Sequence, residues 1–352
     1  MRKALIFPVL LGFAIALGAQ TLPLTREEYV KMLYALQRSP GTKADIIAAL
    51  RGRGIDFPVN DGLRDLTRSK GSNDAELNRA LEEAGRRKAD PVAAKFPDVK
   101  EAGELLEKTR ANTLAAVEEM PDFVVKQQIE RSMAFAGTGN FRPLDRLVVA
   151  VSYRTTGEET YKILAVNGLV RTNPEEKGSY EEAGGTSSTG EFVTVLSTIF
   201  KPESLTKFEA AETDVLRGRK AIVYSFSTDK EHAKELITAT GYSTDSTIAG
   251  MQGRVWVDRQ DARVLRIESD ATDIPRDFII RSAKRNIDYD WVSIAGEKYL
   301  LPSLSEVRLT DAQQGKGYET RNVIKFKEYK KYGSEVKILD DDIKPEDTKK
   351  PN

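Results

Sequence analysis

The sequence predicts an α+β fold, in which a small all-α module precedes a curved antiparallel β-sheet that forms a half-open barrel covered by one or two helices. Three observations predict it. Apolar residues recur at helical spacing as far as about residue 120. Beyond that point they alternate with polar residues at a period of two, which is typical of a sheet with one buried face. Several of these alternating runs are long, and long strands accumulate twist and curve.

Composition excludes several classes of protein. The 352 residues include 54 Lys+Arg, 54 Asp+Glu, one His and no Cys. A chain without Cys has no disulfides, thiolate metal sites or cysteine nucleophile. A formal net charge of zero argues against a broad electrostatic surface for nucleic acid. We therefore expect no nucleic-acid partner and no cofactor.

The N-terminus predicts a signal peptide over residues 1–19. Arg2 and Lys3 precede an uncharged apolar run from Ala4 to Ala19, which is too short for a typical membrane-spanning helix. The run ends in small residues, which predicts cleavage near Ala19. We expect an exported protein that is periplasmic or secreted.

Residues 22–87 predict the helical module. Thr25 and Glu28 form a capping-box pattern ahead of apolar residues at helical spacing, and further helices fit 41–54, 62–69 and 74–84. A weak twofold repeat of about 31 residues aligns 44–54 with 75–85. A DNA-reading helix-turn-helix is disfavoured because no basic stripe is present. A protein-interaction module and a packing appendage without a partner remain as alternatives.

Residues 88–98 predict a charged linker that contains Pro91, and a bridging helix follows from Val99 to Met120. The β domain completes the unit at 99–339, ahead of a charged, disordered tail at 340–352. About ten strands are predicted: 123–135, 146–155, 160–166, 208–216, 220–227, 251–258, 262–270, 278–292, 299–309 and 318–329.

The apolar face of such a sheet needs a cover. Besides the bridging helix, residues 190–200 predict an amphipathic helix, preceded by a loop at 184–190 that is flexible by composition. The apolar side chains of this helix and four aromatic residues of the strands are candidates to line a hollow, with plain core packing as the alternative. The candidate ligand-binding residues are Phe192, Val195, Leu196, Ile199, Phe200, Trp256, Tyr289 and Trp291, and Tyr299 is a further aromatic residue that could line the same hollow.

Five short blocks carry a family resemblance: Trp256–Asp258, Arg263–Glu268, Ile287–Asp290, Tyr299–Pro302 and Arg321–Phe326. In this order they resemble an uncharacterised family of exported, β-rich bacterial proteins. The strand order and lid helix are more distantly similar to periplasmic lipoprotein carriers and to outer-membrane lipoprotein-sorting-like proteins. That resemblance implies a half-open barrel whose apolar hollow is lidded by helices, and it supplies no catalytic residue.

No motif predicts catalysis. His232 lies in a polar stretch, Ser204 and Lys207 match Ser-x-x-Lys without its companion motifs, and Asp340–Asp342 lack the alternation of a calcium loop. Acidic residues such as Asp258, Glu268 and Asp288 are better explained as outward-facing charges than as glycosidase pairs. We expect no catalytic residue and no metal site.

The sequence therefore favours an exported, non-enzymatic binding protein that holds an apolar or acyl-chain ligand between the sheet and the lid helix. The expected partners are a lipid or a lipidated protein, a protein partner through residues 22–87, and a peripheral membrane contact. The alternative is a structural or protein-interaction scaffold whose sheet is filled by its own side chains. A hydrolase with an unrecognised site ranks last.

Overall fold

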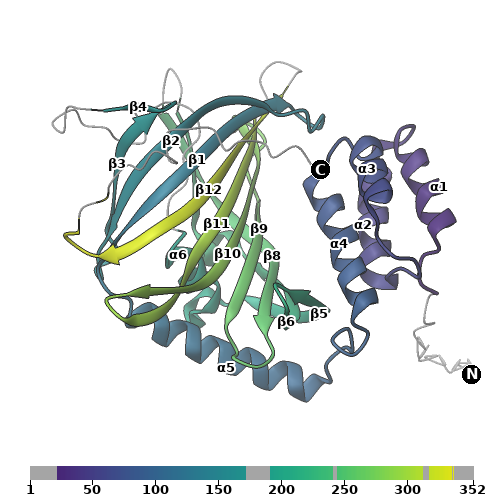
Figure 1. Ribbon diagram of the computed structural model, residues 1–352, viewed down its shortest axis with the longest axis horizontal. Helices are drawn as coiled ribbons and strands as arrows, with labels where there is room; N and C mark the ends of the chain where they lie inside the picture. The colour runs from purple at the N-terminus through teal and green to yellow at the C-terminus, as the bar shows by residue number, and fades with distance from the viewer. Residues whose placement is uncertain (1–21, 172–190, 241–243, 312–316, 335, 337–352) are drawn as a thin grey trace, which may run out of the picture.

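The computed structural model describes residues 22–171, 191–240, 244–311, 317–334 and 336 (Figure 1). The predicted signal peptide at 1–19, the loop at 184–190 and the tail at 340–352 lie outside the described residues.

Four helices form the helical module: α1 (Arg26–Leu36), α2 (Lys43–Arg53), α3 (Asp61–Lys70) and α4 (Ala75–Ala89). Three of them begin at a side chain that caps the first turn. Thr25, Asn60 and Asp74 each accept a hydrogen bond from the backbone amide three residues later. The helices enclose their own apolar core, in which burial raises the pKa of Tyr29 to about 12.

Helix α5 (Val99–Glu118), capped by Asp98, leads into the sheet. Its strands are β1 (Phe123–Phe135), β2 (Arg142–Tyr153), β3 (Glu159–Val166), β4 (Leu169–Val170), β5 (Lys207–Leu216), β6 (Arg219–Thr228), β7 (Glu235–Thr240), β8 (Thr244–Asp258), β9 (Val264–Thr272), β10 (Ile280–Ile294), β11 (Glu297–Asp311) and β12 (Tyr318–Lys331). Two short helices interrupt them, α6 (Thr194–Phe200) and α7 (Lys230–Ala233).

In the described part of the chain the strands form one antiparallel sheet in the order β4-β3-β2-β1-β12-β11-β10-β9-β8-β6-β5, with β7 pairing beside the first half of β8. The sheet curves strongly and does not close, because β4 and β5 are separate edges (Figure 1). The predicted α+β fold, with helices ahead of a curved open sheet, is confirmed.

The concave face of the sheet holds the main core. Helix α5 runs along one end of the sheet and α6 lies within its curve (Figure 1). Both helices pack with β6, β8, β9 and β10 in one apolar cluster. A second cluster continues over β1, β2, β3, β11 and β12. The helical module packs on the opposite, convex face beside β5, β8 and β9.

Every predicted strand is present, with bounds that differ by a few residues. Two strands were not predicted, the two-residue β4 and β7, and β8 begins at Thr244 rather than residue 251. The lid helix predicted over 190–200 is helical from Thr194.

Candidate functional site

The apolar part of the concave face is occupied by α6. Val195, Leu196, Ile199 and Phe200 are all buried there, against strands and against α5. The Phe200 ring stacks on Phe208 of β5, with the ring centroids 5.4 Å apart. The predicted helix therefore covers the predicted face, and its side chains take up the space next to the sheet.

The structure brings six of the eight predicted residues to this face. Tyr289 joins the four α6 side chains in one cluster. Phe192 lies in the neighbouring cluster, where its ring packs edge-on against Phe123 and Phe326. Tyr299, the fourth aromatic residue, packs partly buried against that second cluster.

The assignment of Trp256 to the concave face was wrong. Val255 and Val257 point into the concave cluster, so Trp256 between them points to the convex face. There its indole N–H donates to Asp214 at 2.9 Å, and the Arg254 guanidinium lies over its ring.

The assignment of Trp291 was also wrong, for a different reason. On β10 the inward positions are Ile287 and Tyr289, and then Val292 and Ile294. The alternation shifts by one residue between Tyr289 and Val292, close to a register irregularity that β10 and β11 show at Asp288 and Tyr289. Trp291 consequently points outward and is 44% exposed.

A polar row crosses the concave face above the apolar floor. Cross-strand pairing aligns one residue from each of six adjacent strands in this row. They are Ser269 (β9), Arg285 (β10), Val307 (β11), Asn322 (β12), Arg131 (β1) and Asp145 (β2). The adjacent row is Val255, Ile267, Ile287, Ser305, Ile324, Ile129 and Leu147, apolar apart from Ser305. Arg131 and Asp145 form a two-pronged ion pair, with N–O distances of 2.6 and 2.5 Å.

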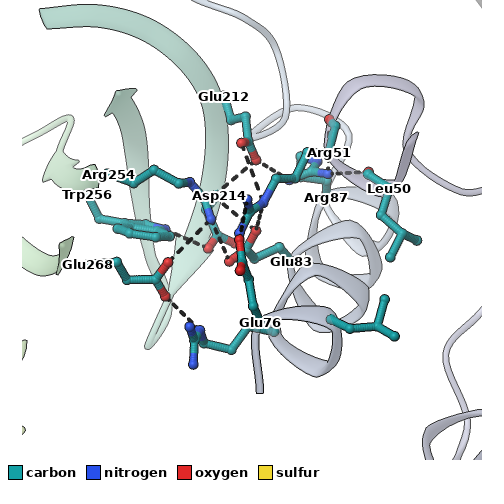
Figure 2. A network of polar contacts seen from close by, with 12 residues as sticks. Leu50, Arg51, Glu76, Glu83, Arg87, Glu212, Asp214, Arg254, Trp256 and Glu268 are labelled. Atoms are coloured by element: carbon teal, nitrogen blue, oxygen red, sulfur yellow. Dashed lines mark hydrogen bonds and ion pairs between the residues drawn. The ribbon is translucent and has the colours of Figure 1, made fainter. Parts of the chain in front are cut away.

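The convex face carries a second arrangement, a network of ion pairs between α4 and the sheet (Figure 2). Arg254 of β8 lies 3.0 Å from Glu83 and 3.2 Å from Glu212. Arg86 forms two hydrogen bonds of 2.9 Å to Asp214, the carboxylate that also accepts from Trp256. We use the name seam network for all the residues in this arrangement. They are Arg51, Arg79, Glu83, Arg86, Arg87, Glu212, Asp214, Arg254, Trp256 and Glu268.

Burial and charge act in opposition in the seam network. Burial would raise the pKa of Glu83, but the Arg254 and Arg51 guanidiniums outweigh it and hold that pKa below its usual value. Burial dominates at Glu212, and with the charge of Glu83 nearby it raises the pKa of Glu212. Glu83 is therefore held charged by its arginine partners, which fits a role in docking α4 on the sheet.

Beside the seam network lies a cleft of about 300 Å³ between the turn from α3 to α4 and the convex face. Its walls carry both signs of charge, including Lys43 and Arg308 against Asp74, Glu306 and Glu319. Such a mixture does not select for an anion or a cation.

Sequence reasoning missed Arg285 and the seam network. Arg285 was detectable, since the period of two places it on the same face as Ile287 and Tyr289, and a cation within an apolar stripe is unusual. The seam network carried no such signal, because outward charges on a half-exposed strand are ordinary until a partner covers them.

The structure places the three residues whose sequence patterns are related to catalysis, His232, Ser204 and Lys207, in ordinary structural contacts. His232 lies on α7, with Nδ1 2.6 Å from Asp229. The Ser204 hydroxyl donates to the carbonyl of Lys201 at 2.7 Å, while Lys207 is exposed on β5. Within the described ranges, no group of three or more His, Asp or Glu side chains is arranged to bind a metal ion. Among those same residues, no helix combines the length and apolar character needed to span a membrane.

The fold and its site thus define an α+β protein with an open curved sheet, a concave face covered by two helices and a convex face covered by a helical module. Among solved structures, it is similar to a DUF1329 family protein from Desulfovibrio piger ATCC 29098. The alignment covers 68% of this chain and 97% of that one, at 9% identity and a TM-score of 0.27. No family model and no curated protein matches the chain.

Proposed function

We propose that this protein is a non-enzymatic binding protein that holds an apolar chain on the concave face of its sheet, at the place that α6 occupies. One observation carries the proposal. The apolar floor of an open sheet is covered there by a helix of seven residues with no side-chain cap at its start. Isolated helices shorter than about 12 residues are marginal in water, so α6 depends on its contact with the sheet.

The free energy gained by burying apolar surface is comparable for α6 and for a bound alkyl chain. Burying the four apolar side chains of α6 is worth about 6–12 kcal/mol, at about 1.5–3 kcal/mol each. A dodecyl chain with about 11 methylenes gains about 9 kcal/mol on leaving water. A bound chain can therefore replace α6 on the sheet at little net cost.

The predicted signal peptide supports a location for this activity in the periplasm or in the surrounding medium. A lipid or the acyl group of a lipidated protein has the required chemistry. A peripheral contact with a membrane would give the protein access to such chains.

The test uses 1-dodecanol as a neutral probe, with binding followed by native mass spectrometry and hydrogen exchange. We expect the dodecanol complex to show faster amide exchange over 194–200, because the chain displaces α6. Leu196→Ala weakens the docking of α6 and should tighten dodecanol binding several-fold. Leu304→Ala, on the convex face, is the matched control and should change nothing.

Absence of dodecanol binding in every variant, or binding that leaves exchange over 194–200 unchanged, contradicts the proposal. Those results would support the second candidate, a structural scaffold with a self-filled sheet. The complete burial of Ile199 and Phe200 favours that candidate. A protein partner would then dock through the helical module.

A further inference from the structure

Arg285 differs from the other arginine of the concave polar row. Arg131 is matched by Asp145 through two short contacts. Arg285 has one ion pair, from Nη2 to Glu235 of β7 at 3.2 Å, and its buried Nε has no hydrogen-bond partner among the described residues. A guanidinium carries five N–H donors in a planar fork, and the ion pair with Glu235 engages only its Nη2 end.

The Arg285 side chain is 18% exposed, but its Nε is buried, and burying an N–H donor without a partner is costly, which makes the position of this arginine informative. Burial lowers the pKa of Arg285, but Glu235 and the buried Glu191 outweigh this and hold the pKa above its usual value. The side chain is therefore charged at neutral pH. It remains positive on a face whose adjoining rows are mostly apolar.

Arg285 lines a small cavity of about 80 Å³ on the concave face beneath β7. Ser269, directly across from Arg285 on β9, adds a buried hydroxyl-bearing residue to the lining. Glu235, Lys284 and Thr238 also line the cavity, and its other walls are apolar, including Ile237, Met251, Ala271, Ala283, Val307 and Leu309. A few polar groups set in apolar walls are typical of a site that orients an amphipathic ligand.

The cavity adjoins the face assigned to the apolar chain. Met251 lines the cavity and also packs in the cluster that contains α6. A chain bound in place of α6 would have its polar end within reach of this cavity.

We infer that Arg285 and Ser269 form the head-group subsite for a carboxylate, so that the ligand class is a long-chain fatty acid. This inference rests on the proposed function and adds the charge of the ligand to it. The carboxylate accepts from the guanidinium donors that Glu235 leaves free, while Glu235 stays on Nη2. Because Glu235 and the ligand then share one cation, Glu235 limits the affinity.

The experiment compares dodecanoate with 1-dodecanol, which has the same chain and no charge, by calorimetric titration at pH 8. The wild-type protein should bind dodecanoate about ten to a hundred times more tightly, the range expected for hydrogen bonds to a charged group. Arg285→Met should remove this preference, and Arg285→Lys, which keeps the charge but loses the fork, should retain part of it. Arg281→Met, at an exposed position of the same strand, is the matched control and should leave the preference intact.

Glu235→Gln distinguishes a head-group site from a purely structural ion pair. The variant should bind dodecanoate several-fold more tightly and dodecanol with unchanged affinity. Loss of thermal stability with no gain for dodecanoate would overturn the inference. Equal binding of the two probes by the wild-type protein would overturn it too, while leaving the proposed function in place. If neither probe binds, the proposed function fails and this inference fails with it.

Discussion

At the scale of residues, carboxylates on the convex face are buried together with the arginines that neutralise them. Asp288 of β10 shows the principle. It accepts two hydrogen bonds of 2.8 Å from Arg266 and a third of 2.9 Å from Arg217. Burial alone would raise the pKa of Asp288, but these guanidiniums hold it below its usual value. The charged carboxylate therefore ties neighbouring strands together.

Asp288 makes a testable contribution to stability against acid. A carboxyl group whose pKa is lower in the folded state stabilises the fold above its unfolded pKa of about 3.9, and this stabilisation is lost as pH falls through the folded pKa. Asp288→Asn should cost about 3–5 kcal/mol at pH 7, because the largely buried Arg266 loses its partner, and should flatten the loss of stability below about pH 4. Urea unfolding between pH 2 and 7 measures both. Asp290→Asn, at an exposed position, should leave both the stability at pH 7 and its dependence on acid unchanged.

The two tryptophans give a second prediction. Trp256→Phe removes the indole donor to Asp214 and should cost about 1–3 kcal/mol in the free energy of unfolding. Trp291→Phe, at an exposed site, should stay within about 0.5 kcal/mol. Neither change should alter dodecanol binding, because neither side chain faces the concave side. A loss of binding in Trp256→Phe would contradict the assignment of faces.

At the scale of elements, periodicity found the long strands because a buried face imposes strict alternation on them. The same rule failed at Trp291, because the inward positions of β10 move by one residue between Tyr289 and Val292. It also missed β7, a strand that pairs with β8 alone and carries exposed Leu236 beside buried Ile237. Sequence placed the lid helix correctly, but it could not show that the helix side chains fill the face they cover.

Helix α5 depends on its cap for its first turn. The Asp98 carboxylate accepts from the amide of Glu101 at 2.8 Å. Asp98→Ala should cost about 1 kcal/mol and Asp98→Asn very little, since Asn caps equally well. Thermal unfolding of the two variants measures the difference. Equal melting temperatures for Asp98→Ala and the wild-type protein would show that the cap contributes nothing.

At the scale of the whole molecule, the seam network joins the helical module to the sheet through charge rather than through a broad apolar contact. Arg254 of β8 connects Glu83 of α4 with Glu212 of β5 and Glu268 of β9 (Figure 2). Removal of one buried partner leaves the other charge uncompensated, so the members of the network should depend on one another.

A double-mutant cycle tests this dependence. Glu83→Gln and Arg254→Met should each cost about 3–5 kcal/mol, and the double variant should cost clearly less than the sum. Urea unfolding gives the three values. Additive costs would mean that Glu83 and Arg254 do not act as a pair.

The position of β1 beside β12 governs the order in which the sheet can fold. Strands β8 to β12 form by successive neighbouring hairpins, but Phe123 must find Lys331 and Phe135 must find Tyr318. Such distant pairing is slow, because a long loop has to close before the contacts stabilise it. During synthesis one edge of β1 therefore stays unpaired until β12 has been made. The part of the concave core that lies over β1 and β12 is then the last to assemble.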